Sequence, residues 1–175
     1  MKKGFTIVET LVAITVLMIA ISGPLTVSFR ALNAAVASRD QMIASFLAQD
    51  AMEYARNLKD NNISDGAPEG WLQTIGECTI KNKCSVDTTT NIIRPECLKF
   101  TGGRCNLYKD QTGKYNHVSA SGSFATPFYR TMYVQNIQAN SEEESAELIV
   151  DVIWTTGSYA TASTTFRSTI YNIAK

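Results

Sequence analysis

The hydrophobic pattern begins with one long apolar run near the N-terminus. No charged side chain occurs between Thr10 and Phe29, a run of about 20 residues, which is the length that a helix needs to cross the hydrocarbon core of a bilayer. Lys2 and Lys3 precede this run. Basic residues beside a span stay on the cytoplasmic side, so we expect a single-pass inner-membrane topology with the rest of the chain outside.

Beyond the run, apolar residues recur at steps of three, four and seven, which is typical of one helix face. They are Phe29, Leu32, Val36, Ile43, Phe46, Leu47, Ala51, Tyr54 and Leu58. The pattern predicts one helix from Thr6 to about Asn61, about 80 Å long. Its first half should lie in lipid or against other helices, and its second half should carry a globular head. Gly23 and Pro24 should break or kink it, because proline removes a backbone hydrogen bond.

The last fifty or so residues alternate like strands. Phe128–Gln138 is rich in aromatic and β-branched residues, and residues 147–154 and 160–170 alternate with period two. Three strands with short connections predict an antiparallel meander with one face against the helix. The segment between helix and strands is turn-rich, and we expect an irregular loop region that Trp71 and Leu72 anchor in the core.

Four cysteines lie within this loop region, namely Cys78, Cys84, Cys97 and Cys105. An even number in an exported segment predicts disulfides, and four cysteines allow three connectivities. We expect the local pairs, Cys78–Cys84 and Cys97–Cys105. The spacing does not resemble the close cysteine pairs of zinc sites, so we expect no metal there.

The composition gives little support to catalysis or nucleic-acid binding. The formal net charge is zero, which does not favour a nucleic-acid surface. His117 is the only histidine, and we find no nucleophilic elbow or phosphate-binding loop, so an enzyme, a cofactor or a small-molecule substrate is not expected. Glu9 is the exception within the N-terminal segment, because a carboxylate at the start of an apolar span is costly and suggests a functional partner.

The sequence KKGFTIVE, followed directly by an apolar helix, resembles the N-terminal signal of the type IV pilin and pseudopilin family. The resemblance implies that a prepilin peptidase cuts after Gly4 and that Phe5 becomes the N-methylated first residue. It also implies that Glu9 acts in assembly with other pilin subunits. The segment 47–62, LAQDAMEYARNLKDNN, is similar to the end of the long helix in minor pilins. The helix-breaking proline of the family usually lies slightly deeper in the membrane than Pro24.

These observations predict a pilin-like α+β chain. We expect a leader at 1–4, a membrane and filament-core helix at 5–30, and a head at 31–175. Within the head, the helix continues over 31–61, the loop region with the expected disulfides covers 62–127 and the sheet covers 128–173. The expected function is a structural, minor subunit of a type IV pilus or pseudopilus, first in the membrane and then in an extracellular or periplasmic filament. The alternative is a filament-tip or membrane-tethered binding or adhesion module.

The N-terminus could also be an ordinary secretory signal or a plain membrane anchor. A secretory signal would be cut near Ala35-Val36-Ala37 and leave Ser38 as the first residue, but such signals have apolar regions of about 7–15 residues. A plain membrane anchor would fit the length of the run, but it does not explain Glu9.

Overall fold

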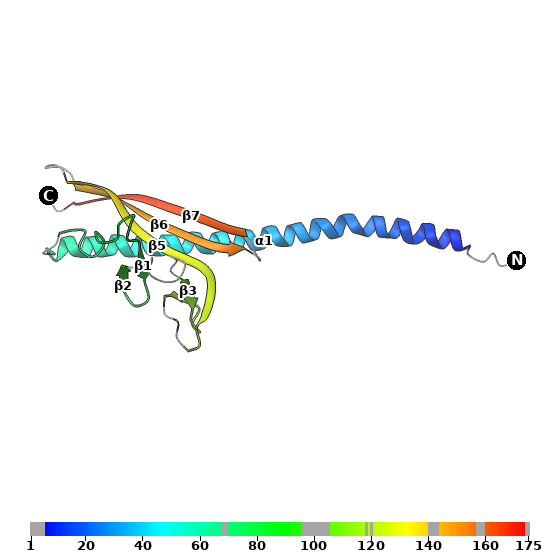
Figure 1. The fold of residues 1–175 in the computed structure, drawn as a ribbon, viewed down its shortest axis with the longest axis horizontal. Coiled ribbons are helices and arrows are strands. Elements are labelled where there is room, and N and C mark those ends of the chain that lie inside the picture. The colour runs from blue at the N-terminus through cyan, green and yellow to red at the C-terminus, as the bar shows by residue number, and fades with distance from the viewer. Residues whose placement is uncertain are drawn as a thin grey trace. The chain divides into compact units, whose positions relative to one another are not determined.

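A computed structural model describes residues 6–67, 70–95, 106–117, 119, 121–139, 144–156 and 160–173. It contains one long helix followed by seven strands that form one sheet (Figure 1). The elements are α1 (Ile7–Ser64), β1 (Cys84–Asp87), β2 (Ile92–Pro95), β3 (Asn106–Lys109), β4 (Tyr115–Asn116), β5 (Phe124–Ala139), β6 (Glu144–Thr156) and β7 (Ala160–Tyr171). The chain forms two compact units, Met1–Arg39 and Asp40–Lys175. We call the second the head unit.

In the first unit, α1 buries none of its apolar side chains. Every described residue from Thr6 to Arg39 is exposed. Among the described residues, α1 is the one helix long and apolar enough to span a membrane, with a mean hydropathy of 2.1 over its most apolar stretch. Such a surface is unstable in water and requires lipid or other apolar helices around it.

In the head unit, α1 packs against the sheet through a stripe of small side chains. Ala44, Ala48, Ala51 and Ala55 are fully buried, and Leu47 and Met52 lie between them. Their spacing of three and four residues confirms the predicted amphipathic second half. Phe46 differs from the prediction, because its side chain is 63% exposed and faces away from this core.

The three predicted strands are β5, β6 and β7, and they form an antiparallel meander as expected. Met132 pairs with Val150, and Val150 pairs with Phe166, so their side chains lie on the helix-facing side of three consecutive strands. The core consists of this face and the alanine stripe of α1. These elements confirm the α+β, pilin-like fold class.

The segment 62–127 is more regular than the sequence predicted. It contributes β1, β2, β3 and β4, each of four residues or fewer. β1 and β3 pair with the edge of β5 that β6 leaves free, at Cys84–Met132 and Tyr108–Ala125. Strands this short carry no readable period-two pattern, since their stability comes from pairing with β5. The prediction of an irregular loop region was therefore wrong for these residues.

One predicted disulfide is present. Cys78 and Cys84 are bonded, with 5.3 Å between their Cα atoms, and both are fully buried. The Cys78 carbonyl accepts a hydrogen bond of 2.7 Å from the Val134 amide, so the bridge joins the loop to β5. Cys97 and Cys105 lie outside the described residues, and their pairing stays a prediction.

Candidate functional site

The first turn of α1 positions Glu9. Thr6 precedes the helix, and its Oγ1 and carbonyl oxygen both accept hydrogen bonds from the Glu9 amide, at 3.3 and 3.1 Å. Thr6 is therefore an N-cap, and the Thr-x-x-Glu spacing is that of a capping box. The sequence TIVE contains this signal, although the cap was not among the predictions. An acidic side chain in the first turn also interacts favourably with the helix dipole.

Of the other predicted N-terminal residues, the structure describes Gly23 and Pro24 but not Gly4 and Phe5. Gly4 and Phe5 lie outside the described residues, so cleavage and methylation there stay predictions. Gly23 and Pro24 lie within α1, which is continuous from Ile7 to Ser64. The structure thus shows no break in the helix at Gly23 and Pro24. A Cβ at Gly23 would meet nothing within 4 Å.

The hydroxyl side chains of the apolar run bond to their own helix. Their Oγ atoms donate to backbone carbonyls three or four residues earlier, at 2.8 to 2.9 Å, in Thr10, Thr15, Ser22, Thr26 and Ser28. Hydroxyls satisfied in this way do not need water or a partner helix. The run therefore remains compatible with a membrane interior despite its polar residues.

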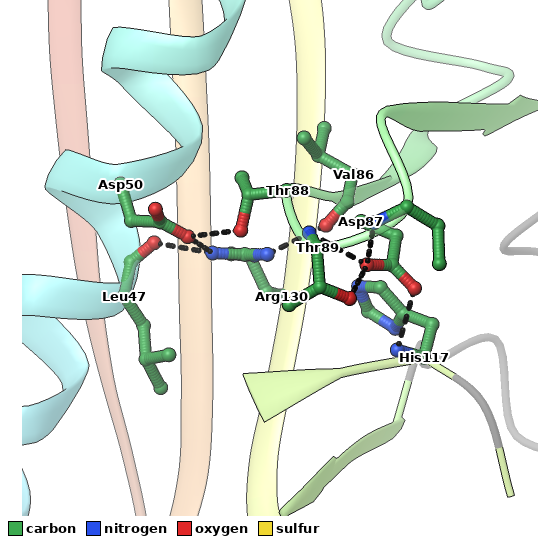
Figure 2. Close-up of polar contacts among 9 residues, drawn as sticks. Leu47, Asp50, Val86, Asp87, Thr88, Thr89, His117 and Arg130 are labelled. Atoms are coloured by element: carbon green, nitrogen blue, oxygen red, sulfur yellow. Dashed lines mark hydrogen bonds and ion pairs between the residues drawn. The ribbon is translucent and has the colours of Figure 1, made fainter. Parts of the chain in front are cut away.

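The head unit has a second polar centre that was not predicted from the sequence. Arg130, on β5, is completely buried, and Figure 2 shows its guanidinium between α1 and β1. Nη1 donates to the Leu47 carbonyl and to Asp50 Oδ2, both at 2.8 Å, and Nη2 donates to the Val86 carbonyl at 2.6 Å. One cation thus joins three elements distant in sequence. We call Arg130 and Asp50 with these two carbonyls the Arg130 cluster.

A turn after β1 adjoins this cluster. Asp87 is buried, and its Oδ1 accepts hydrogen bonds from Thr89 and Thr90, while its Oδ2 accepts one from the His117 amide at 3.2 Å (Figure 2). Burial opposes ionisation of Asp87, but these hydrogen bonds outweigh it and lower its pKa. The ionised Asp87 carboxylate therefore links β1 to the segment after β4.

His117 lies beside the same turn and is partly buried, not a plain surface residue. Its Nδ1 lies 2.9 Å from the Asn106 carbonyl, so the neutral ring carries its proton on Nδ1 and donates it. Burial, and then the charge of Arg130, lower the pKa of His117 from 6.5 to about 4. The imidazole is therefore neutral at physiological pH.

This shift predicts that the head unit loses stability in acid. The folded pKa of His117 lies below the unfolded one, so the unfolded chain takes up the proton first. The stability that neutral His117 contributes is present above pH 6.5 and is lost as the pH falls toward 4. We expect a loss of about 2–3 kcal/mol between pH 7 and 4.5. Tryptophan fluorescence during denaturant unfolding in detergent can measure it, because both tryptophans, Trp71 and Trp154, lie in the head unit.

The matched control is His117→Asn, whose side-chain amide can still donate to the Asn106 carbonyl. This variant should show a flatter dependence of unfolding free energy on pH over the same range. An equally steep dependence in the variant would assign the acid sensitivity to other groups.

The arrangement of these residues is that of a structural junction. Among the described residues, no group of three His, Cys, Asp or Glu side chains could hold a metal ion. Arg130 could have been noticed in the sequence, because it follows Phe128 and precedes Met132 and Val134 in the period-two phase that faces the core. A charged residue in that phase predicts a buried ion pair.

Comparison with known proteins identifies the N-terminal segment alone. A family model described as the prokaryotic N-terminal methylation motif matches residues 1–23. No curated protein and no solved structure matches the chain. The motif supports a prepilin signal of the type IV pilin kind, and the apolar helix that begins within it agrees with membrane anchoring. The chain thus carries a prepilin-type methylation motif at its N-terminus, and its fold is α+β and pilin-like.

Proposed function

We propose that this chain is a minor subunit of a type IV pilus or of a related pseudopilus. It is cut after Gly4, methylated on Phe5 and assembled with other pilins through its N-terminal helix. The observation that carries the proposal is the methylation motif at residues 1–23 together with α1, which begins within the motif at Ile7 and has no buried residue before Asp40. A bundle of sister helices would cover that apolar surface as lipid does.

The proposed topology places the N-terminus in the cytoplasm and the head outside. Lys2 and Lys3 favour it by the positive-inside rule. The Cys78–Cys84 disulfide supports it independently, because such bonds persist in oxidising compartments and are rare in the cytosol. The proposed parts are a leader at 1–4, a filament-core helix at 5–30 and a head from 31, although the compact head unit itself begins at Asp40.

The segment around Gly23 and Pro24 is the proposed place where α1 loses helical structure on assembly. The backbone nitrogen of Pro24 cannot donate to the carbonyl four residues earlier, and glycine is a weak helix former. This segment is therefore the least stable part of the apolar helix before the head unit.

Processing at Gly4 tests the proposal. The wild-type chain, purified from membranes, should have an intact mass that begins at methylated Phe5. Gly4→Val should leave the full-length precursor in the membrane, because the peptidase no longer finds the residue before the cut. A wild-type chain that begins at Met1 would indicate a plain anchor, and one that begins at Ser38 would indicate an ordinary secretory signal. Maturation of Gly4→Val to the wild-type mass would show that the cleavage site is elsewhere.

A further inference from the structure

The β7 strand leaves one edge of the sheet open. β7 pairs with β6 over all twelve of its residues, from Ala160 to Tyr171, without a register shift. Among the described strands, none pairs with its other edge, and Figure 1 shows β7 at the margin of the sheet. A regular edge of this length offers a row of backbone N–H and C=O groups that another strand can pair with.

The other outer strands of the sheet are protected in ways that β7 is not. β2 has four residues and includes Arg94 and Pro95, and β4 has two. Short edges, charges and prolines are the usual means by which proteins prevent strand addition. β7 has one charged residue, Arg167, and no proline, and the rest is mostly threonine, serine and alanine. Among the described residues, β7 therefore lacks these forms of protection.

A groove lies beside this edge. It has a volume of about 670 Å³ and lies between one side of α1 and residues 166–168 of β7. Phe46, Met52 and Phe166 give it apolar walls, and Glu53 and Arg56 supply charges. Side chains alternate across a strand, so every second side chain of a strand added to β7 would point toward this groove.

We propose that the β7 edge binds an extended segment of another polypeptide, which adds to the sheet as a strand. The backbone of the segment would pair with β7. Apolar side chains at alternate positions would enter the groove, and polar ones would face solvent. This mode of recognition takes its affinity from main-chain hydrogen bonds and its specificity from alternate side chains. It goes beyond the assembly role, because it gives the head unit a binding activity of its own.

The direction of β7 argues against a second copy of this chain as the occupant. Arg56 Nη2 donates to Ser168 Oγ at 2.7 Å, and Lys59 Nζ donates to the Tyr171 carbonyl at 3.5 Å, so β7 runs parallel to α1. Two β7 strands paired antiparallel would point their helices in opposite directions. Two paired in parallel would turn one sheet over and bring its polar face, rather than Phe166, to the groove. Subunits anchored in one membrane, as the proposed function requires, do not suit the first arrangement.

The probe for the test is a labelled peptide with the sequence of β6, Glu144–Thr156, which already pairs with β7 and has apolar residues at alternate positions. The full-length chain in detergent is titrated with this peptide, with empty micelles as the blank. Alternate β7 amides, those not bonded to β6, should become protected from hydrogen exchange on binding. Failure of the peptide to protect any β7 amide at millimolar concentration would overturn the proposal.

Two peptides N-methylated at alternate backbone nitrogens, in opposite phases, separate strand pairing from adsorption. Both partition into micelles alike, but only one keeps the N–H groups that face β7. We expect the peptide that keeps these N–H groups to bind, and the peptide that lacks them to bind at least about tenfold more weakly. Equal binding of the two would overturn the proposal.

Proline substitutions at adjacent residues test the edge itself. In Ser163→Pro and Thr164→Pro, one variant loses an N–H that bonds to β6 and the other loses an N–H on the open edge. The variant that loses the open-edge N–H is recognised by its nearly unchanged melting temperature. This variant should bind the peptide about tenfold more weakly than the wild-type chain. Wild-type binding by this variant would overturn the proposal. Sedimentation of the wild-type chain as a dimer that this variant abolishes would also overturn it, because the occupant would then be a second copy. None of these results depends on processing at Gly4.

Discussion

Replacing Asp50 with alanine should lower the free energy of unfolding of the head unit by about 2–4 kcal/mol. Arg130 is fully buried, and Asp50 is the carboxylate that contacts its guanidinium, at 2.8 Å. Removing one partner of a fully buried ion pair costs about 3–5 kcal/mol, because a charge is left without compensation. The Asp50 side chain is 49% exposed, so water can partly take its place beside Arg130. We therefore expect a smaller loss than for a fully buried pair. Tryptophan fluorescence during denaturant unfolding in detergent measures the change.

Three further variants separate the charge from the packing. Asp50→Asn keeps an acceptor for Arg130 Nη1 and should cost less than Asp50→Ala. Arg130→Met removes the buried charge and keeps much of its length. The double variant Asp50→Ala/Arg130→Met should cost less than the sum of the two single changes. Asp50→Ala leaves the Arg130 charge unpaired, and Arg130→Met removes that charge. Additive costs, or a change of less than about 0.5 kcal/mol in Asp50→Ala, would show that the cluster is not a stabilising junction.

Glu9→Ala should prevent most of the chain from entering filaments, while its synthesis, cleavage and membrane insertion stay normal. Cleavage after Gly4, as proposed, creates a positive amine on Phe5, four residues before Glu9 in the sequence. That amine, or the same amine of a neighbouring subunit, is a partner for the carboxylate where little water competes. We expect the ratio of chain in sheared filaments to chain in membranes to fall about tenfold, which corresponds to about 1.4 kcal/mol.

The N-cap at Thr6 makes two controls necessary. Glu9→Gln keeps a side chain that can complete a capping box but removes the charge. Thr6→Ala removes the cap and keeps the carboxylate. If charge pairing sets the position of the subunit, Glu9→Gln fails like Glu9→Ala and Thr6→Ala assembles. Normal assembly of Glu9→Gln, with a defect in Thr6→Ala, would instead assign the role of Glu9 to the helix terminus. Normal assembly of Glu9→Ala would contradict any role in the filament.

The elements with many periods could be predicted from the sequence. α1 and the strands β5, β6 and β7 are long enough for spacing to distinguish helix from strand. The helix end was also readable, because Gly66 takes a φ of +61° and the Ala67 amide bonds back to the Asn62 carbonyl. Local turn chemistry decides such a feature, and the sequence contains it.

The elements that the prediction missed depend on partners distant in sequence. β1 and β3 exist because β5 has an edge to pair with, and no property of four residues indicates that edge. The Arg130 cluster is similar, since the alternation places Arg130 in the core but cannot tell that Asp50, on a helix about 80 residues earlier, will meet it. Capping at Thr6 is a local feature, and the Thr-x-x-Glu spacing in the sequence contains its signal.

The hydroxyl hydrogen bonds within the apolar run have a consequence for how the helix changes surroundings. Thr10, Thr15, Ser22, Thr26 and Ser28 donate to carbonyls of their own helix. The bonds of Thr10 and Thr15 lie before the segment around Gly23 and Pro24, so neither has to break or find a new acceptor when lipid tails are exchanged for neighbouring side chains. For the first turns of the helix, the work of moving between the two media then depends mainly on shape and on Glu9. Ser22, Thr26 and Ser28 differ, because their acceptors lie in or beside the segment that is proposed to lose helical structure.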